Sequence, residues 1–266
     1  MEGLLKGKVA VITGAGSGVG REAALLFARH GASVVVADID SARVEETAAL
    51  VKAQGGAARS SVCNVTDAVA VTRTVQLAVE AFGRLDVMYN NAGITASTQP
   101  GKGLKTLVET TQEDIDRVQS VNLGGVIHGC QAAIRQFEAQ NGGGVIVNTA
   151  SVAGLVGYGG VLYGASKGAV AILTRTLAIE VAAKGIRVNS VCPSGMLTHF
   201  GGMDPDGPLA ERIRTGMNSA SLLGRAVSAE DCANAALFLA SDLSSSITGV
   251  NLPVDAGLSA GVPMRK

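Results

Sequence analysis

The chain has 266 residues, of which 47% are hydrophobic, so it is long enough to bury a large core. Its 22 basic and 22 acidic residues balance at neutral pH, which argues against nucleic acid or an anionic membrane as a partner. The four cysteines form no C-x-x-C pair, so we expect neither a disulfide framework nor a metal site, and we expect a cytoplasmic protein.

Short β-branched runs alternate with longer helical patterns along the chain. The N-terminal residues show no signal-peptide pattern and lead directly into a strand. Strands are predicted at residues 8–13, 33–38, 58–64, 85–93, 144–151, 186–193 and 249–255. Helical patterns cover residues 22–31, 41–55, 67–83, 111–140 and 163–184. This alternation predicts a single α/β domain over residues 1–266, with a doubly wound, seven-stranded, mostly parallel sheet and helices on both faces.

One apolar stretch, residues 152–173, is long enough to suggest a membrane span. Six glycines and the pair Ser166-Lys167 interrupt it. We therefore interpret it as a loop followed by a buried helix.

A glycine-rich segment, TGAGSGVG at residues 13–20, joins the first strand to the first helix. A loop at this position can turn tightly, approach a pyrophosphate and direct helix N–H groups at it, although a plain tight turn is the alternative. Asp38 ends the second strand, where a carboxylate can accept hydrogen bonds from ribose hydroxyls and repel a 2′-phosphate. It could instead cap the next helix. Arg21 and Arg43 lie nearby with no clear role, and we predict NAD rather than NADP as the cofactor.

A second pattern, YGASK at residues 163–167, places Lys167 four residues after Tyr163. Residues at this spacing share one face of a helix. A free tyrosine titrates near pKa ~10, and a neighbouring positive charge favours the phenolate. We therefore expect Lys167 to lower the pKa of Tyr163, so that the phenol can exchange a proton with an alcohol or ketone.

Together these motifs resemble the short-chain dehydrogenase/reductase family, in its shorter-chain, NAD-preferring branch. The resemblance rests on TGAGSGVG, Asp38, NNAG at residues 90–93, Asn122, Ser151, YGASK and VNSVCPSG at residues 188–195, in the family's order. It implies a Rossmann-type fold. It assigns Tyr163 as the acid/base and Ser151 as the hydroxyl that holds the substrate oxygen. Lys167 would also hold the nicotinamide ribose, and Asn122 would help to order a proton-relay water.

The resemblance also implies a set of cofactor contacts. Asn90 is the residue of NNAG that we expect at the adenosine, and Asn64-Val65 stands where the family usually has Asp-Val. Ser194 replaces the commoner glycine after Pro193, and Ala256 replaces another near the C-terminus. The predicted cofactor-binding residues are Gly14, Ser17, Gly18, Val19, Gly20, Asp38, Ile39, Asn64, Val65, Asn91, Ala92, Gly93, Tyr163, Lys167, Pro193, Met196 and Thr198.

Ligands in such sheets bind beyond the carboxyl ends of the strands. Loops there are predicted to supply the substrate wall, namely Ile94, Thr95, Val152, Tyr158, Met196, Leu197, His199 and Phe200. A flexible lid is expected around residues 196–223. Since no Arg or Lys is placed to bind an anion, we predict a neutral, apolar secondary alcohol, cyclic or open-chain, or its ketone as the small-molecule substrate.

Three readings of function follow. The leading one is an NAD-dependent alcohol dehydrogenase/carbonyl reductase. The alternatives are an NADP-dependent 3-oxoacyl thioester reductase, against which Asp38 counts, and a non-catalytic NAD(H)-sensing protein, against which Tyr163 and Lys167 count. The resemblance further implies a homotetramer built on the helices around residues 111–140 and 163–184 and the last strand.

Overall fold

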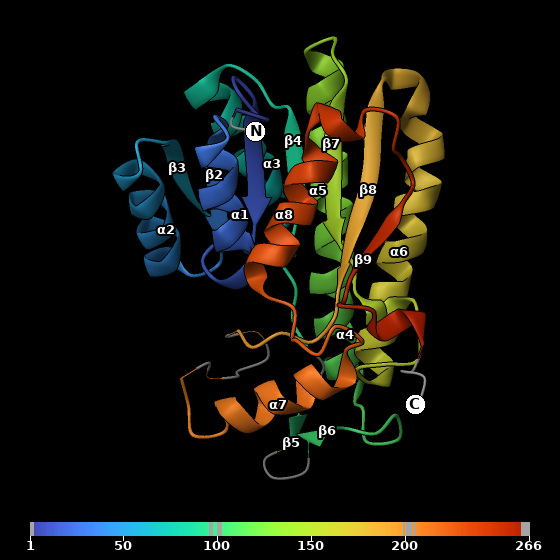
Figure 1. The fold of residues 1–266 in the computed structure, drawn as a ribbon. Helices are drawn as coiled ribbons and strands as arrows, with labels where there is room; N and C mark the ends of the chain where they lie inside the picture. Colours follow the sequence, from blue (N-terminus) through green and yellow to red (C-terminus); the bar gives the residue numbers. More distant parts are fainter. Residues whose placement is uncertain are drawn as a thin grey trace.

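A parallel sheet of seven strands forms the centre of the protein in the computed structural model, which describes residues 3–95, 98–99, 103–198, 200, 204 and 206–261 (Figure 1). The strands lie in the order β3-β2-β1-β4-β7-β8-β9. Their bounds are β1 Val9–Thr13, β2 Ser33–Asp38, β3 Ala57–Val62, β4 Val87–Asn90, β7 Gly144–Thr149, β8 Ile186–Pro193 and β9 Asn251–Val254. Every pairing in this sheet is parallel, which confirms the predicted doubly wound architecture.

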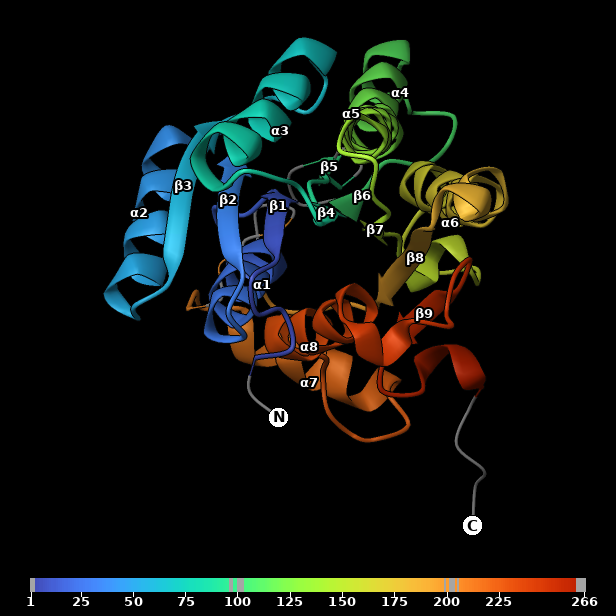
Figure 2. The same ribbon diagram turned by 90° about the horizontal axis from the view of Figure 1, so that it is seen from above.

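Helices cover both faces of the sheet (Figure 2). One layer holds α3 Ala68–Phe82, α5 Gly125–Ala139 and α6 Val161–Val181. The other holds α1 Gly18–Arg29 and α8 Ala229–Ala240, and α2 Ser41–Ala53 lies beside β3 and joins the same core as α1. Because both faces are packed, the residues of the central strands β1 and β4 are all buried, whereas the edge strands β3 and β9 are partly exposed.

Helix α1 begins at Gly18, four residues before its predicted start, and two later predicted helices differ from their observed bounds as follows. The pattern at residues 111–140 divides into α4 Gln112–Gln119, a π-helical turn η1 Ser120–Gly124, and α5. The turn contains Asn122, whose side chain bonds to a neighbouring loop, and such π-helical insertions often mark functional positions. The second helix, α6, begins at Val161, two residues before the predicted start, and a 3₁₀ turn η3 Ala182–Lys184 follows it.

All seven strands of this parallel sheet end at one edge, and further elements lie beyond it (Figure 1). They include helix α7 Ala210–Ala220 and the short antiparallel pair β5 Thr98–Gln99 and β6 Gly103–Leu104. The described residues also form the 3₁₀ turns η2 Val152–Gly154, η5 Asp242–Ser244 and η6 Leu258–Ala260. Within the described part of the chain, no helix has the length and apolar character to span a membrane.

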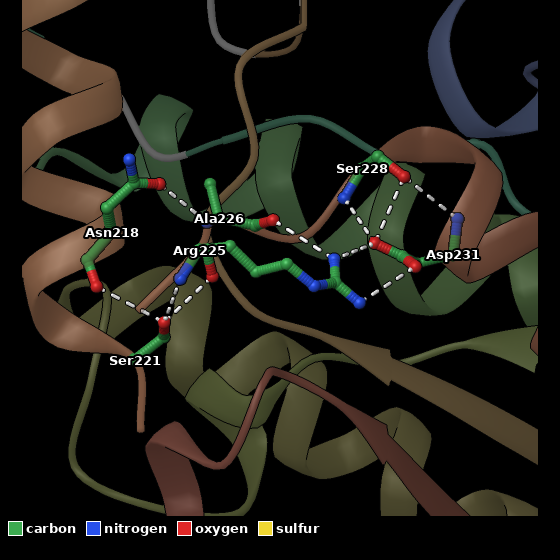
Figure 3. A network of polar contacts seen from close by, with 6 residues as sticks. All are labelled: Asn218, Ser221, Arg225, Ala226, Ser228 and Asp231. Atoms are coloured by element: carbon green, nitrogen blue, oxygen red, sulfur yellow. Dashed lines mark hydrogen bonds and ion pairs between the residues drawn. The ribbon is translucent and has the colours of Figure 1, made fainter. Parts of the chain in front are cut away.

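The C-terminal end of α7 is tied to the start of α8 by a polar network (Figure 3). Arg225 donates to both carboxylate oxygens of Asp231, at 2.8 and 3.3 Å. Asp231 also completes the capping box of α8 with Ser228. The amide of Asn218, in α7, accepts from Ala226 N at 2.7 Å. This network holds the C-terminal end of α7 in place beside the carboxyl edge of the sheet.

Candidate active site

A cavity of about 740 Å³ opens at the carboxyl ends of the strands. The loop between β1 and α1 lines one part, together with the end of β2. The residues that follow β4, β7 and β8, and the first turns of α6, line the rest. The cavity therefore lies where open α/β sheets bind their ligands.

The glycines of the loop between β1 and α1 allow its backbone to lie very close to neighbouring backbone. Gly14 has φ +63°, and a Cβ there would lie 2.8 Å from Ala92 Cα. A Cβ at Gly20 would lie 2.2 Å from the carbonyl oxygen of Gly14. Ser17 occupies the N-cap position of α1, but its side chain makes no capping bond. The result is a cradle of free N–H groups at a helix N-terminus, which fits the pyrophosphate of a dinucleotide.

Asp38 faces this cradle from the end of β2. Its carboxylate accepts from Gly16 N at 3.0 Å and from Asp40 N at 3.1 Å, so it fixes the shape of the loop as well as lining the cavity. The carboxylate can also accept from ribose hydroxyls, which fits the predicted adenosine ribose subsite.

The two nearby arginines, which the sequence left without a clear role, have separate places. Arg21 donates to the Gly16 carbonyl at 2.7 Å and to Thr47 Oγ1 at 3.0 Å, and it pairs with Glu46. It therefore braces the loop against α2. Arg43 lines the cavity, and its Nε lies 3.3 Å from Asp40.

The loop after β4 is fixed to the end of β1. Thr13 Oγ1 accepts from the backbone N–H of Asn91 at 3.0 Å and of Ala92 at 3.1 Å. The amide of Asn91 donates to the carbonyls of Thr13 and Gly14. The expected adenosine contact from Asn90 is wrong, because Asn90 is buried and its amide donates to Asn148 Oδ1 at 2.9 Å.

The candidate catalytic side chains come together around the end of β7 and the start of α6. Lys167 is 2% exposed, and its ammonium donates to the Thr149 carbonyl at 2.7 Å. It lies 5.9 Å from the centre of the Tyr163 ring. Ser151, directly after β7, donates to the Pro193 carbonyl at 3.2 Å and accepts from Ala153 N. Phe200 packs against Tyr163, with ring centres 6.0 Å apart.

The pKa of Tyr163 departs from the sequence-based expectation. Burial raises it to about 12, opposed by a hydrogen bond with Ser151. Burial also lowers the pKa of Lys167 to about 8. The expectation that Lys167 brings the phenol below its ordinary pKa is therefore wrong. The reason is that desolvation outweighs a cation whose ammonium is bonded elsewhere, to the Thr149 carbonyl.

Asn122 is completely buried in the π-helical turn. Its amide accepts from Ile94 N at 2.8 Å and donates to the Ile94 carbonyl at 2.9 Å and to Ser166 Oγ at 3.0 Å. The side chain thus fixes the loop that carries Ile94 into the cavity. Its role in ordering a water molecule stays a prediction.

Most predicted ligand-binding residues line the cavity, and a few do not. Residues that do line it are Gly14, Ser17, Gly18, Val19, Asp38, Asn91, Ala92, Gly93, Ile94, Thr95, Ser151, Tyr158, Tyr163, Lys167, Pro193, Met196, Thr198 and Phe200. Val152 is wrong as a substrate contact, because the turn after Ser151 directs it into the core and brings Ala153 to the cavity. Gly20, Ile39, Asn64, Val65 and Leu197 are not among the lining residues, and His199 lies outside the described residues.

Sequence reasoning missed Arg117, which lies on α4 and lines the cavity. No arginine or lysine was predicted on the substrate wall, so Arg117 is an unforeseen addition to the cavity lining. A helical pattern alone does not say which exposed residue meets a cavity. Among the described residues, no group of three or more His, Cys, Asp and Glu side chains could hold a metal ion.

Comparisons with known proteins agree with this geometry. The family described as "Enoyl-(Acyl carrier protein) reductase" matches residues 14–259. Tropinone reductase-like 2 from Erythroxylum coca is 38% identical over 262 residues, which cover 97% of this chain and 93% of that protein. Meso-2,3-butanediol dehydrogenase from Serratia marcescens is 40% identical over 254 residues, 95% of each chain.

A solved structure gives the same result. The crystal structure of a short-chain type dehydrogenase/reductase from Mycobacterium marinum superposes with a TM-score of 0.87 at 34% identity, covering 97% of both chains. The chain belongs to the short-chain dehydrogenase/reductase family of oxidoreductases.

Proposed function

We propose that the protein is an NAD-dependent dehydrogenase that interconverts a neutral, apolar secondary alcohol, cyclic or open-chain, and its ketone. The observation that carries this proposal is the meeting of Ser151, Tyr163 and Lys167 in the same cavity as the glycine cradle and Asp38. A nucleotide-binding loop and an acid/base phenol are thereby within reach of one bound pair of molecules.

In this proposal the cofactor, when bound, supplies the acceptor or donor of a hydride. The Ser151 hydroxyl, which donates to the Pro193 carbonyl in this structure, would turn to donate to the substrate oxygen instead and hold it beside Tyr163. The phenol then takes the hydroxyl proton during oxidation or returns it during reduction. Proton transfer near neutral pH requires the pKa of Tyr163 to fall from about 12, and a further positive charge brought next to the phenol would lower it.

The preference for NAD rests on Asp38. Its carboxylate already accepts two backbone hydrogen bonds and faces the ribose end of the cavity, where a 2′-phosphate would be repelled. Arg43 lines the same end but pairs with Asp40. A KM for NAD⁺ well below that for NADP⁺ is expected, and the reverse order would contradict the proposal.

The substrate class is supported by two observations. The substrate wall includes Ile94, Ala153, Met196 and Phe200, which suit an apolar body. In addition, two relatives of the chain carry the names tropinone reductase-like 2 and meso-2,3-butanediol dehydrogenase. A screen of NAD⁺ reduction over open-chain, cyclic and steroidal secondary alcohols tests the proposal, and far better turnover of charged hydroxy acids would refute it.

Two alternatives share this fold. A 3-oxoacyl thioester reductase uses the same catalytic residues, and NADPH-dependent reduction of an acetoacetyl thioester at a higher kcat/KM would favour it. A non-catalytic NAD(H) sensor would bind NADH and turn over none of the alcohols. The intact pairing of Tyr163 with Lys167 counts against the sensor.

We further propose a cytoplasmic homotetramer. The four cysteines are buried and unpaired, which suits a reducing compartment. Ile172 and Ile179 lie on the same face of α6, and they are 57% and 81% exposed. Exposed apolar side chains on one helix face suit a contact between subunits. Light scattering of the purified protein would measure the assembly.

A further inference from the structure

One hydroxyl on the substrate wall is left without a partner. Tyr158 lies on the loop between the turn η2 and α6, five residues before Tyr163, and it lines the cavity. Its side chain is 40% exposed in the wall of the cavity, and among the described residues its phenol has no hydrogen-bond partner. A polar group that faces a binding cavity without a protein partner is available to a ligand.

The position of this hydroxyl depends on a glycine. A Cβ at Gly195 would lie 3.1 Å from the Tyr158 hydroxyl oxygen and 3.4 Å from Met217 Cε. The hydroxyl therefore lies over Gly195, with Met217 of α7 next to it. Asn218, the neighbour of Met217, belongs to the network that anchors the end of α7, so this side of the hydroxyl is held in place (Figure 3).

The same backbone segment connects this hydroxyl to the candidate catalytic centre. Gly195 is two residues after Pro193, whose carbonyl accepts from Ser151. Two residues of chain span roughly 7 Å at most. The distance from Gly195 to the Pro193 carbonyl, which Ser151 contacts, is therefore no longer than a small substrate molecule. A substrate whose reacting oxygen is held by Ser151 and Tyr163 would extend across this segment towards Tyr158.

We propose that Tyr158 is a specificity-determining residue that recognises a second oxygen of the substrate, so that the substrate is a diol, or a hydroxyketone in the direction of reduction. The inference rests on the proposed function and narrows its substrate class. The phenol can donate to or accept from that second oxygen. An alcohol with a single oxygen cannot form this bond with the phenol. Its turnover is therefore expected to be lower than that of the diol.

The test compares matched substrates, cyclohexanol and cis-cyclohexane-1,2-diol, in the wild-type enzyme and in Tyr158→Phe. The measured quantity is the kcat/KM of the diol divided by that of the mono-alcohol, because the intrinsic reactivity of each substrate cancels when this ratio is compared between variants. We expect the ratio to fall by about fivefold to tenfold in Tyr158→Phe, the effect of one net hydrogen bond. An unchanged ratio would overturn the inference.

Two further variants make the test specific. Gly195→Ala keeps the phenol but places a methyl group against its oxygen, in an ordinary backbone conformation, and should also lower the ratio. Thr95→Val removes another hydroxyl of the cavity wall. A larger fall in Thr95→Val than in Tyr158→Phe would assign recognition to Thr95 and refute the role of Tyr158.

Binding gives a readout that does not need turnover. In the presence of NADH, which cannot pass a hydride to an alcohol, cis-cyclohexane-1,2-diol should raise the Tm more than cyclohexanol does, and Tyr158→Phe should remove the difference. If this difference is seen but no alcohol reduces NAD⁺, the proposed function fails and the recognition of a second oxygen stands. If both alcohols are oxidised with a ratio unaffected by Tyr158→Phe, only the present inference fails.

Discussion

Replacing Lys167 by methionine should abolish turnover and at the same time stabilise the fold. Lys167 is almost fully buried, and its pKa is lowered from 10.5 to about 8. This difference means that burial disfavours the ammonium by about 3 kcal/mol relative to the unfolded chain. Methionine has a similar length and no charge, and it loses only the bond to the Thr149 carbonyl, which is worth about 1 kcal/mol.

The net expectation at pH 7 is a gain of about 2 kcal/mol in the free energy of unfolding, or about 5 °C in Tm for a chain of this size. The assay is thermal unfolding of wild type and Lys167→Met at one protein concentration, followed by circular dichroism. A Tm for Lys167→Met at or below that of the wild type would show that the buried ammonium does not destabilise the fold.

The pH dependence supplies an independent check with a definite sign. Below pH 8 the lysine is charged in both the folded and the unfolded chain, and the wild type bears the full cost of burial. Between pH 8 and 10.5 the folded chain releases the proton while the unfolded chain keeps it, so the free energy of unfolding rises with pH. The stability advantage of Lys167→Met should therefore shrink across this window, and an advantage independent of pH would contradict the assignment.

Two more predictions concern the acid/base and the cofactor loop. Tyr163→Phe should reduce kcat by about 10²-fold or more and leave NADH binding, measured by fluorescence, close to normal; near-normal activity would exclude Tyr163 as the acid/base. Arg21→Ala should raise the Kd for NADH about tenfold with little change in kcat, because it removes the donor that braces Gly16, and Arg21→Lys should restore part of the affinity. An equal effect of Arg21→Ala on kcat and on Kd would indicate a general loss of structure instead.

The sheet was largely predictable from the sequence because local patterns of β-branched and apolar residues indicate its strands. The bounds of β2 and β8 match the predicted ranges, and both are runs of mainly β-branched and apolar residues buried in a parallel sheet. The ends of α6 and the break before α5 were not predicted. They depend on contacts made across the fold, such as those of Asn122 with the loop after β4.

The candidate site was predictable in its residue types and less so in its environments. Spacing placed Tyr163 and Lys167 on one helix face, but it gave no measure of how deeply each is buried, and burial determines the direction of both pKa shifts. Val152 and Ala153 are adjacent, and only the turn after Ser151 decides which one meets the cavity. Arg117 reaches the cavity through the packing of α4, which no local pattern encodes.

The order of strands in the sheet has a consequence for how the chain emerges from the ribosome. Strands β3, β2, β1 and β4 are adjacent in the sheet and complete by residue 90, so this half can assemble during translation. Its outer edge is β4, whose residues are all buried in the finished protein and whose partner β7 begins only at Gly144. For a period on the order of seconds, the nascent chain therefore presents an apolar strand edge with unpaired backbone groups. Translation pauses or truncations in this interval favour aggregation, and a chaperone that covers β4 until β7 pairs with it would raise the yield of folded enzyme.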